Sequence, residues 1–171
     1  MIKRLRIFLC VLLQSLFFFN VSNAQESCIT NLQQQRKEAL NKLMIGTALY
    51  PIDSLSHKAV VVVFYKTDCP FCEKLMPELF KLQQKYGTNG FRVIAIALDE
   101  DLQEWKSYIK TNGYDVFTNF CDGKSFLGKF PEAYNVYTTP TLFLLDNDWK
   151  LYKKPKRLTD LVEDISELLT R

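Results

Sequence analysis

An uninterrupted apolar run, Ala59–Tyr65, limits the fold of this chain more than any other feature of its sequence. Four consecutive valines followed by two aromatic residues favour a strand, and a strand that is apolar on both faces is buried between two layers. Cys69 and Cys72 follow, and then apolar residues at helical spacing over Glu73–Tyr86. A second, mostly apolar run, Phe91–Leu98, completes a right-handed parallel strand-helix-strand unit. The sequence therefore predicts an α/β fold with helices on both faces of a central sheet.

The second half of the chain contains further elements with clear spacing. A helix is predicted between an acidic start at Asp99–Asp101 and a stop at Asn112-Gly113. Thr141–Leu145 and Trp149–Tyr152 are predicted to pair as a hairpin. Thr159–Thr170 has the apolar spacing of an amphipathic closing helix. The predicted order is β-α-β-α, then a hairpin and a helix.

Two segments have weaker patterns. Residues 25–45 are predicted to be a polar helical extension with a thin apolar stripe, followed by a short strand at 47–50. Between 114 and 137 the sequence indicates only a turn at 121–123 and a short helix within 124–134.

The N-terminus has the composition of an export signal. Met1–Arg6 carries three positive charges and no acid, Ile7–Phe19 is almost wholly apolar, and Ser22-Asn23-Ala24 resembles a small-residue cleavage site. The apolar run is shorter than the roughly 20 residues that span a bilayer. We predict that residues 1–24 are a signal peptide cleaved after Ala24 and that the protein is exported to the periplasm. An uncleaved membrane anchor is the alternative.

The positive net charge belongs to this predicted signal. The chain has 22 Lys and Arg against 19 Asp and Glu, and residues 1–24 contain three of the former and none of the latter. The remainder is formally neutral, so we expect no nucleic-acid partner. Its length suits one domain with a single core.

Because the protein is predicted to be exported, and thiols pair in oxidising compartments, we interpret the cysteines outside residues 1–24 as candidates for disulfides. Cys69 and Cys72 lie one helical turn apart at the predicted start of a helix, where unpaired N–H groups and the helix dipole favour a thiolate. Pro70 at the first helical positions costs no hydrogen bond. The pair therefore predicts a reversible disulfide, in which Cys69 attacks a partner disulfide and Cys72 resolves the mixed disulfide.

Cys28 and Cys121 are the remaining cysteines. A zinc site formed by these two and the close pair is the weaker interpretation, because zinc sites do not require a strand before the pair and a helix after it. We expect no metal and no cofactor. A structural disulfide between Cys28 and Cys121 would tether the N-terminal extension to the 114–137 segment. Two separate thiols, one of which pairs with a partner, are the alternative.

Three local matches beyond the cysteine pair resemble a known family. Pro77 lies five residues after Cys72, where thioredoxins have a helix-kinking proline, and Thr139-Pro140 lies where the family has its cis-proline. Pro140–Asp146 is similar to the Pro-Thr-x-Phe-Leu-hydrophobic-Asp stretch of one branch. Over about residues 44–170 the chain thus resembles the thioredoxin superfamily, specifically the exported TlpA/ResA-like thiol-disulfide oxidoreductases.

The resemblance implies a fold and a set of site residues. Residues 46–171 are expected to form a thioredoxin-like domain, a three-layer fold around a mixed sheet. Cys69 and Cys72 are its catalytic pair, and a cis Pro140 beside the sulfurs leaves the Thr139 backbone free to pair with a substrate strand. Phe71, between the cysteines, is expected to be exposed and to contact substrate.

The chain also departs from the family beside the first cysteine. Asp68 replaces the usual Trp, and its charge opposes formation of the Cys69 thiolate. Lys66 or Lys74 is expected to offset that charge.

A second departure concerns the proton of Cys72. Val63 occupies the position where thioredoxin keeps a buried acid. Glu73 and Glu78 lie near, but not at, the position of the acid of the TlpA-like branch. The group that accepts the Cys72 proton is therefore not predicted.

These features predict an enzyme, a protein thiol-disulfide oxidoreductase that acts as a reductant. The expected partners are exported proteins with disulfides or dithiols, and a membrane thiol electron donor or acceptor. An oxidant or isomerase of the DsbA kind is an alternative, since Pro70 followed by an aromatic residue is common in such relatives. A non-enzymatic binding module with the thioredoxin fold is the other.

Overall fold

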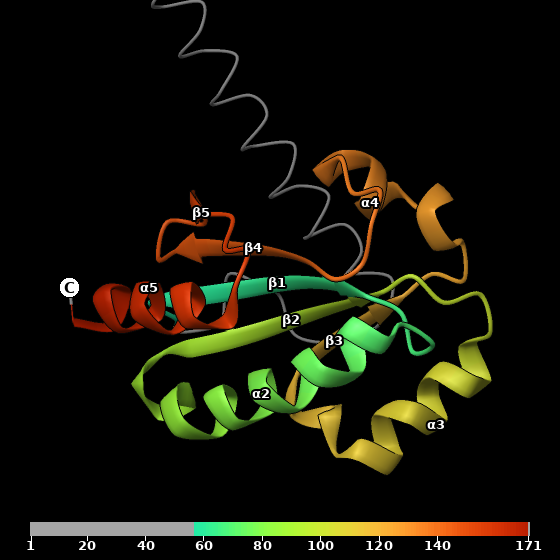
Figure 1. The fold of residues 1–171 in the computed structure, drawn as a ribbon, viewed down its shortest axis with the longest axis horizontal. Coiled ribbons are helices and arrows are strands. Elements are labelled where there is room, and N and C mark those ends of the chain that lie inside the picture. Colours follow the sequence, from blue (N-terminus) through green and yellow to red (C-terminus); the bar gives the residue numbers. More distant parts are fainter. Residues whose placement is uncertain (1–56, 171) are drawn as a thin grey trace, which may run out of the picture. The chain divides into compact units, whose positions relative to one another are not determined.

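The computed structural model describes residues 57–170, which form a five-stranded sheet with helices on both faces (Figure 1). The strands are β1 (Ala59–Tyr65), β2 (Phe91–Ala97), β3 (Thr118–Cys121), β4 (Thr141–Asp146) and β5 (Leu151–Lys153). They lie in the order β3-β2-β1-β4-β5. β1 is parallel to β2 and antiparallel to β4, and β3 is parallel to β2. The mixed sheet of the predicted fold class is thus confirmed.

Helices connect these strands. The described α-helices are α2 (Pro70–Tyr86), α3 (Leu102–Asn112), α4 (Lys129–Tyr134) and α5 (Leu158–Thr170). Short 3-10 helices, η2 (Gly87–Asn89), η3 (Tyr114–Val116) and η4 (Ser125–Leu127), follow α2, α3 and β3. In Figure 1, α2 and α5 lie along one face of the sheet and α4 lies on the other.

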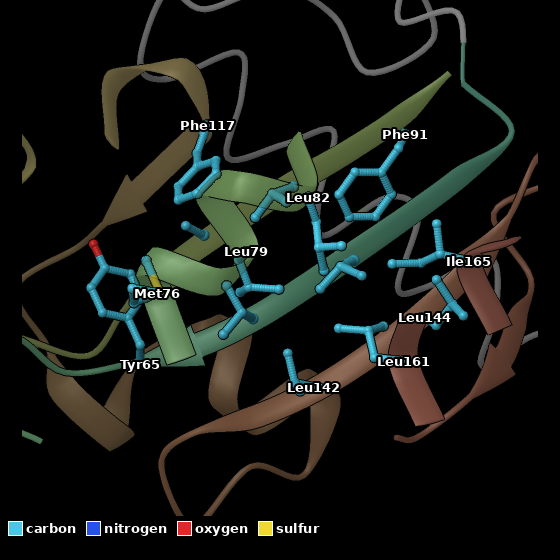
Figure 2. Packing of buried hydrophobic residues seen from close by; sticks show 14 of the residues in the cluster. Tyr65, Met76, Leu79, Leu82, Phe91, Phe117, Leu142, Leu144, Leu161 and Ile165 are labelled. Carbon is cyan, nitrogen blue, oxygen red and sulfur yellow. The ribbon is translucent and has the colours of Figure 1, made fainter. Parts of the chain in front are cut away.

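The core has two apolar layers because successive residues of a strand point to opposite faces of the sheet. On one face, Val61 and Val63 of β1 pack with side chains of α2 and α5. Figure 2 shows Met76 and Leu79 of α2 turned toward this face, and Leu161 of α5 next to Leu144 in the same layer. On the other face the intervening residues of β1 pack against α4. The all-apolar composition of β1 is therefore explained by burial on both sides.

The strongest patterns formed the predicted elements. β1 covers the whole of Ala59–Tyr65, and β2 ends one residue before the predicted run does. Asp101 caps α3 by accepting the N–H groups of Gln103 and Glu104, at 2.8 and 3.0 Å. The predicted stop at Gly113 has φ 70°, a conformation that glycine adopts without steric cost. The short helix within 124–134 and the closing helix are also confirmed as α4 and α5.

Two predictions about strands were wrong. Residues 118–121 form β3, where the sequence indicated only a turn at 121–123. Phe120 is the only buried residue of this four-residue strand. The strand therefore has no apolar run from which it could be predicted. Trp149 was predicted to lie in the last strand, but it has φ 62° in the turn before β5, which begins at Leu151.

Several predictions concern residues outside the described range. They are the signal peptide 1–24, the helical extension 25–45, the short strand at 47–50 and Cys28, and they stay predictions. Within residues 57–170, no helix has the length and apolar character needed to cross a membrane.

Candidate active site

The cysteine pair lies at the edge of the sheet where β1 and β2 end and β4 begins. The carboxyl ends of β1 and β2 share this edge because the two strands are parallel, and the amino end of antiparallel β4 meets them there. The chain turns directly from β1 into α2, and the Cys69 N–H donates to the Lys66 carbonyl at 3.3 Å. Three segments distant in sequence therefore converge on Cys69.

Cys69 is the N-cap residue of α2. Its backbone is extended, with φ −91° and ψ 115°, and its Sγ accepts the N–H of Cys72 at 3.3 Å. Pro70 occupies the first turn, where its missing N–H leaves no bond unmade. The sulfur thus takes the place that a Ser or Asp oxygen holds at other helix starts, facing the unpaired N–H groups and the positive end of the helix dipole.

The segment before β4 supplies the other side of the site. The Cys69 thiol donates to the carbonyl of Thr139, with 3.6 Å between sulfur and oxygen. The peptide bond between Thr139 and Pro140 is cis, as the family resemblance implied. The structure thus brings Thr139 and Pro140 to the sulfur, while their contact with substrate remains a prediction.

The environment of Cys69 favours its thiolate. Burial raises the pKa of the Cys69 thiol, but hydrogen bonds with the side chains of Cys72 and Thr139, and with the backbone of Cys72 and Phe71, outweigh that effect. The pKa of Cys69 therefore lies below its ordinary value of 9.0. Cys69 is also partly exposed, so that an activated sulfur can reach a partner.

Cys72 has the opposite environment. Its side chain is fully buried in the layer between α2 and the sheet. Burial, together with the adjacent Cys69, raises the pKa of Cys72 to about 12 against a lowering by the Lys66 backbone. Both cysteines are free thiols in this structure. One exposed acidic thiol beside one buried weakly acidic thiol is the arrangement expected of an attacking and a resolving sulfur.

The charge of Asp68 is partly offset by a neighbour. Asp68 is exposed, and its Oδ2 lies 3.4 Å from Lys66 Nζ. Of the two lysines proposed for this role, Lys66 is thus the one paired with Asp68 in the structure.

A buried acid that the sequence did not assign to the site lies behind the Cys69 turn. Asp99 is 7% exposed, and its Oδ1 accepts the N–H and the hydroxyl of Thr67 at 3.0 and 2.7 Å. Its Oδ2 is buried with no hydrogen-bond partner among the described residues. Asp99 was assigned to a helix start, yet it lies two residues after the end of β2, a buried strand parallel to β1. That position was the available signal that Asp99 lies against the turn after β1, which leads to Cys69. Val63 is buried and apolar, as expected.

Cys121 is the last residue of β3 and contacts the backbone of Asp99. Its thiol donates to the Asp99 carbonyl at 3.3 Å, and burial raises its pKa. Because Cys28 lies outside the described residues, a bridge between these two cysteines stays a prediction.

Two large aromatic side chains near the pair and the Thr139 segment are exposed. Phe71 is 72% exposed, as predicted, and Tyr137, just before the Thr139 segment, is 79% exposed. Neither was buried during folding, so each is available for contact with another molecule.

A cavity of about 570 Å³ opens on the other side of Cys69. It is bounded by the start of α2, the second half of α3 and η3. Its lining includes Asp68, Glu73, Tyr108 and Tyr114, which the sequence did not assign to one site. Within residues 57–170, no three His, Cys, Asp or Glu residues are grouped as a metal site requires.

Several known proteins are similar to this chain in sequence or in fold. A thiol-disulfide oxidoreductase ResA of Bacillus cereus is 32% identical over 103 residues, which are 60% of this chain and 57% of that protein. The match thus spans less than two thirds of that relative's length. The C-terminal domain of a thiol-disulfide oxidoreductase from Bacteroides thetaiotaomicron is 26% identical with a TM-score of 0.63, over 70% of this chain and 82% of that one.

A third relative agrees with these two. A thiol:disulfide interchange protein DsbE from Chlorobium tepidum is 26% identical with a TM-score of 0.61, over 70% of this chain and 86% of that one. A family model described as thioredoxin-like matches residues 57–151, which is more than half of the chain and includes both cysteines and Pro140. On this match, and on the mixed sheet that underlies it, the chain belongs to the thioredoxin-like family.

Proposed function

We propose that this protein is a thiol-disulfide oxidoreductase that acts through Cys69 and Cys72. The observation that carries the proposal is the unequal pair of thiols. Cys69 caps α2 with a lowered pKa at the surface, and Cys72 is buried with a raised pKa one turn away. The names of the three relatives support the same activity.

The reaction proceeds in two exchanges. The Cys69 thiolate attacks one sulfur of a partner disulfide, forms a mixed disulfide, and releases the other partner sulfur as a thiolate that takes a proton from water. Cys72 then loses its proton and attacks Cys69 Sγ, which releases the second partner thiolate and leaves a Cys69–Cys72 disulfide. Two electrons pass from the protein dithiol to the partner disulfide.

The proposed partners follow from the predicted location. We assign the protein to the periplasm, with a signal peptide that ends at Ala24, and its substrates to exported proteins with disulfides. Thr139 beside the sulfur and the exposed Phe71 are the proposed substrate contacts. A membrane thiol donor returns the disulfide to the dithiol.

The proposed direction is reduction of the partner. Measurement of the equilibrium potential of the Cys69–Cys72 pair tests it. A value near that of thioredoxin, about −270 mV, supports a reductant, and a value near that of DsbA, about −120 mV, would reverse the direction.

Trapping of partners tests the activity itself. The Cys72→Ser variant, which lacks the resolving sulfur, is expected to accumulate mixed disulfides with exported proteins, and the Cys69→Ser variant few. Non-reducing electrophoresis and mass spectrometry of both variants provide the measurement. Equal trapping by both, or none by either, would favour the non-enzymatic binding module.

A further inference from the structure

The cavity beside Cys69 is lined by acidic and aromatic side chains that have no role in the proposed disulfide exchange. We propose that it receives a positively charged group next to the reacting sulfur of the substrate. The preferred substrates are then disulfides with a lysine or arginine side chain beside the reacting cysteine. This inference rests on the proposed oxidoreductase function and adds a substrate class to it.

The charges that border the cavity have one sign. Among the described residues that line it, Asp68 and Glu73 carry negative charge, and none is Lys, Arg or His. Lys66 offsets part of the Asp68 charge from 3.4 Å away. No ion pair involves Glu73 within residues 57–170, so Glu73 provides most of the uncompensated charge.

An aromatic ring adds a second feature that fits a cation. Tyr108 is half-buried and lines the cavity, whereas the ring of Tyr114, which is also in the lining, is buried and stacked on Phe117. The negative face of a tyrosine ring attracts an ammonium or guanidinium group, and does so more strongly where water is partly excluded. Carboxylates and aromatic rings together, without a basic residue, select a cation over an anion or a neutral group.

A proline beside the cavity leaves one carbonyl of α2 without its usual helical donor. Pro77 lies inside α2 and lines the cavity one turn after Glu73. Because proline has no N–H, the Glu73 carbonyl four residues earlier loses its usual helical donor. The Glu73 carbonyl therefore accepts no N–H from position 77.

The position of the cavity links binding to the reaction. Cys69 itself is part of the lining, and the volume lies in the range of pockets that hold small ligands. During attack, negative charge spreads over three sulfurs as the Cys69–substrate bond forms and the substrate disulfide breaks. A cation held within a few ångströms stabilises that charge, and a substrate carboxylate at the same place opposes it.

The test compares three small disulfides whose polar groups lie within two carbons of sulfur and differ in charge. They are cystamine, which is cationic, hydroxyethyl disulfide, which is neutral, and dithiodiglycolate, which is anionic. The reduced protein is mixed with each, quenched in acid and alkylated, and oxidation of the Cys69–Cys72 pair is followed by mass. Each rate constant is divided by that of dithiothreitol with the same disulfide, which removes differences in leaving-group acidity.

We expect cystamine to react fastest and dithiodiglycolate slowest. The normalised ratio between them is expected to be about five- to tenfold at low ionic strength, because the carboxylates are exposed and their effect is moderate. In about 0.5 M salt the ratio should fall toward unity, since screening then acts over a few ångströms.

Variants that remove one carboxylate charge each identify which residue produces the preference for cystamine. Glu73→Gln is expected to remove most of the ratio, and Asp68→Asn less of it, because Lys66 already offsets Asp68. The matched control is Glu78→Gln, which removes a negative charge from the same helix outside the cavity lining and should leave the ratio unchanged.

The two proposals fail in different ways. Equal normalised rates for all three disulfides, or a ratio that Glu73→Gln leaves intact, would overturn the cation site while the oxidoreductase function stands. If no disulfide oxidises the pair, the oxidoreductase function fails. Labelling of Cys69 by trimethylammonioethyl and sulfonatoethyl methanethiosulfonate then tests the cavity alone. A cationic preference that Glu73→Gln abolishes supports the site, and equal labelling overturns it.

Discussion

At the scale of single residues, the site depends on two identical side chains in different surroundings. Cys69 is at a helix start, in contact with N–H groups and with Thr139, whereas Cys72 is fully buried three residues later. The difference arises from backbone position, because Cys69 is the partly exposed N-cap of α2 and Cys72, one turn later, faces the buried layer against the sheet. Reactivity toward alkylating agents should therefore differ strongly between the two.

We predict that Cys69 is alkylated before Cys72. Limiting iodoacetamide applied to the reduced protein should label Cys69 with half-maximal rate at a pH below 9.0, and Cys72 only as the pH nears about 12. Peptide mapping by mass spectrometry distinguishes the two. Cys121, whose pKa is raised, serves as an internal reference. Earlier labelling of Cys72 would exchange the roles of attacker and resolver.

Asp99 offers a prediction about the turn before Cys69. Asp99→Ala removes the acceptor for the Thr67 N–H and hydroxyl and should lower the free energy of unfolding by about 1–3 kcal/mol. Asp99→Asn keeps an oxygen at the same position and should cost less. Urea unfolding of the three proteins provides the measurement, and an equal loss in both variants would show that the charge, not the acceptor, matters.

At the scale of elements, two parts of α2 have different roles. Its first turn holds Cys69 beside unpaired N–H groups, and its middle packs through Met76 and Leu79 into the apolar layer on one face of the sheet (Figure 2). The packing fixes where the N-terminus of the helix points. The position of Cys69 and the packing of α2 both depend on the order strand, turn, helix, which the sequence itself predicts.

Leu79 tests the packing. Leu79→Ala should reduce the free energy of unfolding by about 2–5 kcal/mol, because Leu79 is fully buried and the cavity left behind cannot close completely. Gln84→Ala, at an exposed position of the same helix, should change it by less than about 0.5 kcal/mol. Similar unfolding curves for both variants would contradict the observed packing of α2.

How far the sequence predicted these elements depends on how many faces each one buries. β1 and β2 are buried on both faces, and their apolar runs were sufficient to predict them. β3 buries only Phe120 and was not predicted. Cys69 and Cys72 were found from spacing because they are local. Asp99 and the cavity were not, because they result from contacts between segments 30 or more residues apart, which no local pattern encodes. Thr139 was placed only through family resemblance.

At the scale of the whole molecule, the buried thiol couples redox state to stability. Burial raises the pKa of Cys72 from 9.0 to about 12, so between these values the unfolded chain has lost a proton that the folded protein keeps. Unfolding is then favoured as pH rises. Below that range the contribution of the Cys72 thiol to stability is fully present.

We predict that the reduced protein loses stability above about pH 9 with a slope of about 1.4 kcal/mol per pH unit beyond that of the disulfide form. The comparison isolates Cys72, because Tyr65 and Tyr108, whose pKa values are also raised by burial, are present in both forms. Denaturant titrations from about pH 8 to about pH 11 measure the slopes. The Cys72→Ala variant should behave like the disulfide form, and parallel curves for reduced and oxidised protein would refute the coupling.

The antiparallel placement of β4 beside β1 has a consequence for the order of events in the life of the chain. Cys69 meets Thr139 across 70 residues of sequence, and this contact exists only when β4 has paired with β1. A nascent chain has the α2 segment but not this pairing, so its Cys69 lacks the complete environment that lowers its pKa. The Cys69 thiolate is thus fully favoured only after β4 has paired with β1. An incompletely folded copy therefore reacts less readily with the thiols or disulfides of neighbouring chains.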